Sequence, residues 1–564
     1  MWCAQALALL WVLMPLGVRA QATLYWDTNG STSGTGSSPS GTWAAGSGSV
    51  WNQNSSGKSA TTTWTNGSDA VFSAGSSATG SYTVTVSGTV EVSSITVQEG
   101  TPTFAGGTIR FTDSTPDFSV GSGLTTTVGS TIADNWTGLN KTGAGTLVLT
   151  GANIYNGGTT VSAGTLVAAS DSALGAASWS NTVASGATLA LQGGITLNQN
   201  ALAVTGSGVG GNGALVNLGG DNTLTANTTF SGNTTVSSSA GTLTMSGTVA
   251  LGSGATTVTG AGDVALTGAV QDSSSSASLT YTGTGTMTLA GSAANTFTGT
   301  FTVASGTVVA AKTGGVLATN GGAVNVGDGV GSAGSAVLRL DADQQLATYT
   351  SLLTIKSDGK LAINNVSQTI DKIAGTGLID LATSGKLVVG AYSGSSTFGG
   401  TVTGTGTLEK TGSGTLTFSS SFNFNGTLTL SGGTLALSGV TLGVGTLHIT
   451  ANSILDFSGA SASLLSATNL LIDAGVTLTI TGWSDSVDAF VAQNWAGVVL
   501  GQSGTSATSQ VVFTGYSANS TTWQTYDHQI TPVPEPSLYG ALLLGACTSL
   551  YLVRRRRNRL SGAA

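Results

Sequence analysis

Short stretches of the chain alternate between apolar and polar residues, and glycine, serine and asparagine separate one stretch from the next. Tyr82–Val86, Thr146–Leu149 and Thr427–Leu430 are examples. Alternation places every second side chain on the same face of an extended strand. Between about Tyr82 and Leu465 we find no helical period of useful length. The pattern therefore predicts a long succession of short β-strands.

Gly-Thr-Leu units give these strands a regular spacing. Two units open at Gly145 and Gly164, a period of 19. Five further units open at Gly406, Gly414, Gly426, Gly433 and Gly445, so that alternate units recur with periods of 20, 19 and 19. A related stretch runs from Gly285 to Gly306, a period of 21. A strand, a tight bend, a strand and a longer excursion that recur at this period describe one coil of a solenoid.

We expect an all-β fold, a parallel β-helix solenoid, over residues 76–465. Its coils would lie about 4.8 Å apart. Some 20 coils would give a rod on the order of 100 Å long. The spacing is loose between Thr205 and Asn222, and charged residues are denser between Ala323 and Ala391, so both segments are candidate irregular coils or loops.

Residues 22–75 are rich in tryptophan, with Trp26, Trp43, Trp51 and Trp64. Solenoid ends need atypical coils that cover the open core, so we interpret this segment as an N-terminal cap. The alternative is a carbohydrate-binding platform, in which Trp43 and Trp51 would contact a glycan. Residues 466–530 are interpreted as a C-terminal cap, with a short helix near Asp485–Gln493.

The two ends of the chain have the character of export signals. Residues 1–20 combine an apolar run, Ala6 to Leu16, with a cleavage end of small residues, and predict a signal peptide. An N-terminal membrane anchor is the alternative. Residues 531–564 contain Pro534-Glu535-Pro536, an apolar run at 538–553 and a basic tail at 554–559. The run predicts one transmembrane helix, and Arg554, Arg555, Arg556 and Arg557 would hold its end on the cytoplasmic side.

Composition excludes several classes of protein. Of 564 residues, 85 are glycine and only 7% are charged, with 7 prolines, which excludes collagen and argues against disorder driven by charge. The formal net charge of −8 and the lack of Lys and Arg clusters in the body disfavour a nucleic-acid partner. Cys3 and Cys547 are the two cysteines, so residues between them form no disulfide and offer no thiolate to a metal.

Candidate catalytic residues are few. Arg339, Asp341 and Asp343 would share one face of a strand, as a possible polysaccharide-cleaving site or as a surface ion pair. His448 and His528 are isolated in the sequence, without a nearby Ser-Asp or metal-ligand partner. Asp113 and Asp117 flank a turn, and residues 206–213 are a loop that lacks the Asp of a calcium-binding nonapeptide. We predict no catalytic residues, no metal site and no cofactor.

The tail resembles the PEP-CTERM sorting signal, because a Pro-Glu-Pro motif, one membrane helix and a basic end follow one another at the C-terminus. The resemblance implies that an exosortase-type membrane protease recognises Pro534, Glu535 and Pro536 and removes the segment after them. It also implies an exported protein of Gram-negative bacteria, anchored in the inner membrane before processing, then at the cell surface or in an exopolysaccharide matrix.

The body resembles the autotransporter-associated β-strand repeat. Lys141–Ala169 has its KTGxGTLxL opening and its GGTTVxxGTL end, Lys410–Leu416 repeats the opening, and Thr282–Met287 is a weaker copy. The resemblance implies a right-handed β-helix. An autotransporter would end in a membrane β-barrel, whereas this chain ends in one predicted helix.

Three functions remain open at this point. The first is a non-catalytic surface or matrix structural protein. The second is a carbohydrate-binding adhesin that uses the Trp-rich segment or exposed aromatic residues such as Tyr155. The third is a β-helix enzyme acting on polysaccharide. We expect the structural role.

Overall fold

The computed structural model describes residues 21–134, 138–274, 277–349, 352–459, 461–503, 505, 508–517 and 520–533. The predicted signal peptide, the Pro-Glu-Pro motif, the predicted transmembrane run and the basic tail lie outside these residues. The chain divides into two compact units, one up to Ala176 and one from Ala177 onward. Each unit is a parallel β-solenoid, in which a strand pairs with the equivalent strand of the next coil.

The first unit contains two sheets. Sheet I comprises β3 (Trp51–Asn52), β1 (Thr23–Trp26), β4 (Ser68–Phe72), β6 (Thr89–Val97), β8 (Thr108–Phe111), β9 (Asp117–Val120), β11 (Thr131–Asp134), β12 (Leu139–Thr142) and β14 (Thr159–Val161). Sheet II comprises β2 (Gly41–Ala44), β5 (Ser81–Ser87), β7 (Thr101–Ala105), β10 (Thr125–Val128), β13 (Thr146–Leu149) and β15 (Thr165–Ala168). Within these sheets β1 pairs antiparallel with β3, whereas pairs such as β1 with β4 and β13 with β15 are parallel.

The second unit contains four stacked sheets and a terminal hairpin. Sheet III comprises β16 (Ser180–Val183), β19 (Ala201–Thr205), β22 (Asn227–Ser231), β25 (Val249–Leu251) and β28 (Val270–Asp272). Sheet IV comprises β17 (Thr188–Gln192), β20 (Leu215–Gly219), β23 (Thr234–Ser238), β26 (Ala255–Thr259), β29 (Ser278–Tyr281), β31 (Phe301–Val303), β33 (Val324–Val326), β35 (Leu353–Ile355), β38 (Ile373–Gly375), β41 (Ser396–Phe398), β44 (Thr415–Phe418), β46 (Gly433–Leu437), β48 (Ser453–Asp456), β50 (Leu478–Thr481) and β52 (Val511–Phe513). Sheet V comprises β18 (Thr196–Leu197), β21 (Asn222–Leu224), β24 (Thr242–Met245), β27 (Asp263–Leu266), β30 (Thr286–Gly291), β32 (Gly306–Lys312), β34 (Ala336–Leu340), β36 (Gly359–Ile363), β39 (Leu378–Asp380) and β42 (Thr401–Thr403). Sheet VI comprises β37 (Ser367–Ile370), β40 (Lys386–Val389), β43 (Thr407–Thr411), β45 (Phe422–Ser431), β47 (Thr441–Ile449), β49 (Leu464–Ile472) and β51 (Ala489–Trp495).

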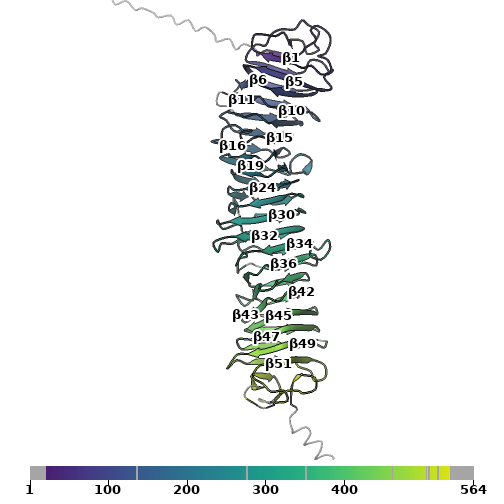
Figure 1. The fold of residues 1–564 in the computed structure, drawn as a ribbon, viewed down its shortest axis with the longest axis vertical. Helices are drawn as coiled ribbons and strands as arrows, with labels where there is room; N and C mark the ends of the chain where they lie inside the picture. The colour runs from purple at the N-terminus through teal and green to yellow at the C-terminus, as the bar shows by residue number, and fades with distance from the viewer. Residues whose placement is uncertain are drawn as a thin grey trace, which may run out of the picture. The chain divides into compact units, whose positions relative to one another are not determined.

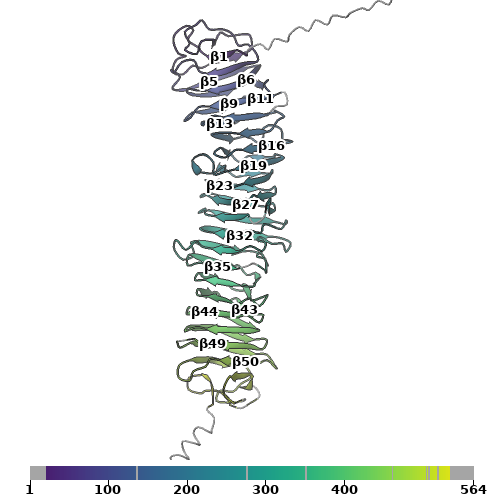
Figure 2. The same cartoon turned by 180° about the vertical axis from the view of Figure 1, so that it is seen from behind.

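Successive strands of sheet VI form successive layers of the second unit, from β43 to β51 (Figure 1). The opposite view shows β44 and β50, which belong to sheet IV (Figure 2). The side chains that point inward are mostly Leu, Val, Ile, Phe and Ala, and nearly all are less than a tenth exposed. The alternation along each strand therefore separates core from surface, as the sequence predicts.

Coil length varies more than the Gly-Thr-Leu spacing suggests. Thr146 pairs with Thr165, an offset of 19 in residue number, and Leu387 pairs with Leu408, an offset of 21. Some coils are much longer, since Gly306 pairs with Ala336 and Leu478 pairs with Val511. The sheet register is kept in these long coils because the additional residues lie in loops between strands. The predicted loose segment contains one such loop, with the 3-10 turn η1 (Val209–Gly211).

The helix predicted near Asp485–Gln493 is wrong. Residues 489–495 form β51, in which Phe490 and Ala492 are buried and pair in register with Leu465 and Ala467 of β49. The period-2 pattern of these apolar residues outweighs the helix propensity of the segment. Among the described residues, no helix is long and apolar enough to cross a membrane.

Antiparallel strands end two of the sheets, namely sheet I of the first unit and sheet VI of the second unit. In the first unit β3 pairs antiparallel with β1. In the second unit β53 (Thr521–Trp523) and β54 (Ile530–Pro532) form an antiparallel hairpin beside β51, where the Ala492 amide donates to His528 O at 3.1 Å. The other short element of this region is the 3-10 turn η2 (Thr508–Gln510). These features suit the predicted end caps, and the capping role stays a prediction.

Candidate functional site

The tryptophans predicted to form a glycan platform are buried. Trp43 and Trp51 are both 0% exposed. Their ring centroids lie 5.3 Å apart, and Trp51 lies 4.6 Å from Trp64. Burial of large aromatic rings away from water stabilises the folded state strongly, and here the rings fill the interior of the first coils. The aromatic cluster is therefore core, and neither Trp43 nor Trp51 has an exposed face for the glycan contact that was the alternative interpretation of this segment.

Tyr155 is not an exposed aromatic residue either. Its ring is 0% exposed, and its hydroxyl forms a hydrogen bond with Thr159 Oγ1 at 2.6 Å. Burial is the main cause that raises the pKa of this phenol above its ordinary value. Tyr155 is therefore a core residue of the first unit and not one of the exposed aromatic residues that the adhesin alternative assumed.

The candidate residues Arg339, Asp341 and Asp343, at and just beyond the end of β34, form two different arrangements. Arg339 donates to Asp341 through Nε at 3.0 Å and Nη2 at 2.8 Å, and Asn364 Nδ2 also donates to Asp341. Asp343 Oδ1 instead accepts a hydrogen bond of 2.7 Å from the backbone amide of Ser367, which connects Asp343 to the next coil. The structure thus forms one surface ion pair and one turn contact here, not the paired carboxylates that glycoside cleavage uses.

His448 has a partner that sequence analysis missed. Its Nε2 lies 2.9 Å from Asp473 Oδ1, one coil further on. The large separation in the sequence hides the pair, but β47 and β49 place His448 beside Leu471, close to Asp473. The other histidine, His528, places Nδ1 3.1 Å from Gln493 O. Neither lies in a metal-binding group, since the described residues contain no cluster of three or more His, Cys, Asp or Glu that could hold a metal.

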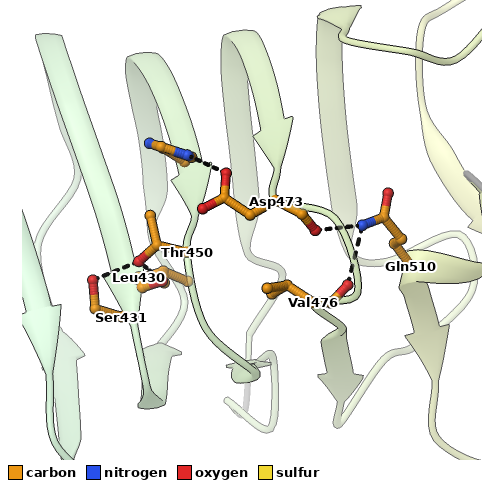
Figure 3. Close-up of polar contacts among 7 residues, drawn as sticks. Leu430, Ser431, Thr450, Asp473, Val476 and Gln510 are labelled. Atoms are coloured by element: carbon orange, nitrogen blue, oxygen red, sulfur yellow. Dashed lines mark hydrogen bonds and ion pairs between the residues drawn. The ribbon is translucent and has the colours of Figure 1, made fainter.

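His448 and Asp473 lie on a polar face formed by the outward side chains of sheet VI, here called the sheet VI face. Near them, Ser431 Oγ at the end of β45 and Thr450 Oγ1, directly after β47, are 2.7 Å apart (Figure 3). Gln510 Nε2 donates to the backbone oxygens of Asp473 and Val476, which fixes the turn that carries the carboxylate (Figure 3). The Ser431 hydroxyl is bonded to Thr450 and Glu409 rather than to His448, so these residues do not form a Ser-His-Asp triad.

The sheet VI face is ordered in rows by the strand register. One row is Thr407, Thr427, Thr446, Asn469 and Asn494. The next row is Glu409, Thr429, His448 and Leu471, in which Thr429 is buried and the others are at least partly exposed. Neighbouring members of a row are about 4.8 Å apart, the spacing of paired strands. Thus hydroxyl, amide, imidazole and carboxylate groups form a regular array.

The carboxylate of Glu409 is also paired on this face. Lys386 Nζ lies 2.8 Å from Glu409 Oε2. Burial opposes ionisation of Glu409, but hydrogen bonds from Lys386 and Ser431 outweigh it and lower the pKa of the carboxyl. Glu409 is therefore an ionised, bonded group and not a poised acid.

Two buried lysines of the repeats have their ammonium groups among backbone carbonyls. Lys141 Nζ donates to Thr142 O and Gly143 O at 2.8 Å and to Ala163 O at 3.0 Å. Lys410 Nζ donates in the same way to Thr411 O, Gly412 O and Gly432 O. In both cases the third carbonyl belongs to the next coil. Burial lowers the pKa of Lys141 to about 8.

This carbonyl contact was not predicted. In the sequence, Lys-Thr-Gly marks only the opening of the repeat. A signal was present, because a lysine at an inward position of an alternating strand needs buried acceptors. Lys312, followed by Thr313 and Gly314, is a third example, and its Nζ donates to Gly268 O at 2.8 Å.

Comparisons with known proteins agree with the stacked repeats. Three stretches match the Passenger-associated-transport-repeat: residues 139–168, 279–310 and 408–437. They include the two repeats that begin at Lys141 and Lys410 and the weaker copy at Thr282–Met287, so this resemblance is confirmed. No solved structure matches the chain.

The chain is also similar to the adhesin BmaC autotransporter of Brucella suis biovar 1 (strain 1330). The two are 31% identical over 214 residues, which cover 35% of this chain and 6% of the adhesin. The chain thus matches a small part of a much longer protein. The matched repeats end before the predicted PEP-CTERM tail, which stays a prediction.

Proposed function

We propose that this chain is an exported, non-catalytic cell-surface adhesin built on passenger-type repeats. The similarity to the Brucella adhesin over 214 residues is the observation that carries the proposal. The three matched repeats support it, because such repeats stack into solenoids with long solvent-exposed faces. The similarity to an adhesin therefore favours adhesion over the purely structural role that the sequence alone led us to expect.

Adhesion is tested directly by deleting the gene and restoring it. Cells that lack the protein should attach less to surfaces, host cells or exopolysaccharide than cells that express it, and purified chain should compete for attachment. Equal attachment by both cell types, with the protein shown at the surface by antibody, would contradict the proposal.

The route to the surface is a separate part of the proposal. Export through a signal peptide at residues 1–20 would be followed by inner-membrane anchoring, and an exosortase-type protease would recognise Pro534, Glu535 and Pro536. The apolar run and four consecutive arginines after the motif support this route. Changing Glu535→Ala should leave uncleaved chain, detected by mass spectrometry as protein that keeps Arg554–Arg557. Cleavage of this variant at the wild-type rate would exclude the motif.

A further inference from the structure

We propose that the sheet VI face, from β43 to β51, binds a neutral oligosaccharide chain. This inference rests on the adhesive function proposed above and gives it a location and a ligand class. It replaces the buried tryptophans as the glycan-contacting surface.

The sheet VI face is broad. The strands β45, β47, β49 and β51 contain 10, 9, 9 and 7 residues. By contrast, β31, β33, β35 and β38 of sheet IV contain 3 residues each. Long strands in register present several rows of side chains at once, so an extended ligand can contact more than one row.

The central rows of the sheet VI face combine apolar and polar side chains. His448 offers an imidazole ring, and Leu471, next to it in register, is 36% exposed. Thr446 and Asn469 lie beside them in the adjacent row, and Asn494 Nδ2 reaches Asn469 Oδ1 at 3.2 Å. A sugar ring has an apolar C–H face and a polar rim of hydroxyls. A planar ring and a leucine bordered by hydroxyl and amide groups complement both parts.

The carboxylates at the sheet VI face are paired. Asp473 is bonded to His448 at 2.9 Å and Glu409 to Lys386 at 2.8 Å. These pairs leave the central rows of the sheet VI face without the surplus of cationic groups that an acidic polysaccharide would require. A neutral ligand avoids repulsion from the carboxylates and can still donate hydrogen bonds to them.

Sheet IV provides a matched control surface. Thr235, Thr257, Thr280 and Thr302 are aligned there in register as one row of outward threonines. This row supplies hydroxyls at the same strand spacing, but its strands are short and it contains neither a ring nor a leucine. Loss of binding from the sheet VI face alone would show that the chemistry of that face, and not a threonine row in general, is responsible.

The experiment measures binding of the purified full chain to an array of neutral oligosaccharides of glucose, galactose, mannose and N-acetylglucosamine, with alginate and hyaluronan as acidic probes. The test variant combines His448→Ala, Asn469→Ala and Leu471→Ala. The control combines Thr257→Ala, Thr280→Ala and Thr302→Ala. We expect about tenfold weaker binding for the test variant and less than about twofold change for the control. The single change His448→Gln, which keeps a polar side chain, should weaken binding by about threefold.

Circular dichroism and the urea midpoint of each variant show whether it is folded. If the triple variant is unfolded, the single variant His448→Gln provides the test of binding. Wild-type binding by both test variants would overturn the inference, as would preference of the unaltered chain for alginate or hyaluronan. Failure to bind any neutral glycan, while the chain still mediates attachment, would overturn this inference and leave the adhesive function standing. Failure of attachment itself would overturn the adhesive function.

Discussion

At the scale of single residues, coils are joined by side chains that reach backbone groups one coil away. Asn153 accepts the Ile132 amide at 2.9 Å and donates to Ala173 O at 2.7 Å. Asn295 repeats this, accepting from Val270 and donating to Ala318 O, both at 2.9 Å. Each buried Asn side chain thus forms hydrogen bonds with a backbone N–H of one neighbouring coil and a backbone C=O of the other. These backbone groups lie at corners of the coils, where the strand ladder does not pair them. The buried lysines act in the same way through their carbonyl contacts.

Removing the ammonium group of Lys141 should destabilise the first unit. Lys141→Met keeps the buried aliphatic stem but leaves three backbone oxygens without their donor. We expect a loss of about 1–3 kcal/mol in the free energy of unfolding, the usual cost of unpaired buried polar groups. Urea unfolding followed by tryptophan fluorescence measures it, with the exposed Lys58→Met as the control. Equal midpoints for the two variants would show that the carbonyl contact contributes nothing.

At the scale of elements, the sequence predicts the strand positions and the register that depend on local spacing. The Gly-Thr-Leu units mark β13, β15, β44 and β46, and the observed register pairs these strands as their spacing predicts. The sequence does not reveal contacts that depend on coil length. His448 and Asp473 meet because the loop between their strands has the length that completes one coil, and the burial of Trp43 and Trp51 depends on several chain segments that converge in the first coils.

Glycines at the bends allow close approach of successive coils. A Cβ atom added at Gly145 would overlap Gly121 O of the preceding coil, whereas one added at Gly129 would meet its nearest atoms at 3.5 Å. We therefore expect Gly145→Ala to destabilise the first unit by about 1–3 kcal/mol, the range for overpacking. Gly129→Ala should have a much smaller effect. Thermal unfolding of both variants tests this, and a Gly145→Ala variant as stable as Gly129→Ala would show that the backbone moves aside without cost.

At the scale of the whole molecule, buried titratable groups give stability a defined dependence on pH. Burial lowers the pKa of Lys141 and Lys312 to about 8 from 10.5. Above pH 8 the unfolded chain binds more protons at these lysines than the folded chain does, so stability should rise with pH. Burial raises the pKa of Tyr281 to about 12 from 10.0, so above pH 10 the unfolded chain releases protons first and stability should fall.

We therefore expect the urea midpoint to increase between pH 8 and 10 and to decrease above pH 10. The rise should be smaller in a chain that carries both Lys141→Met and Lys312→Met, because the shifted amines are then absent. A midpoint that falls steadily from pH 8, or a rise that both substitutions leave intact, would contradict this assignment.

The hairpin β53–β54 has a consequence for growth of the fold. A parallel stack offers its last strand as a template for one more layer, and identical chains can add to such a template without limit. Beside β51, that position is taken by backbone running in the opposite direction, since Val491 and Gln529 form an antiparallel bridge. The hairpin thereby blocks the addition of a further parallel strand at this edge, and we expect removal of residues 520–533 to let purified chains polymerise, as measured by light scattering.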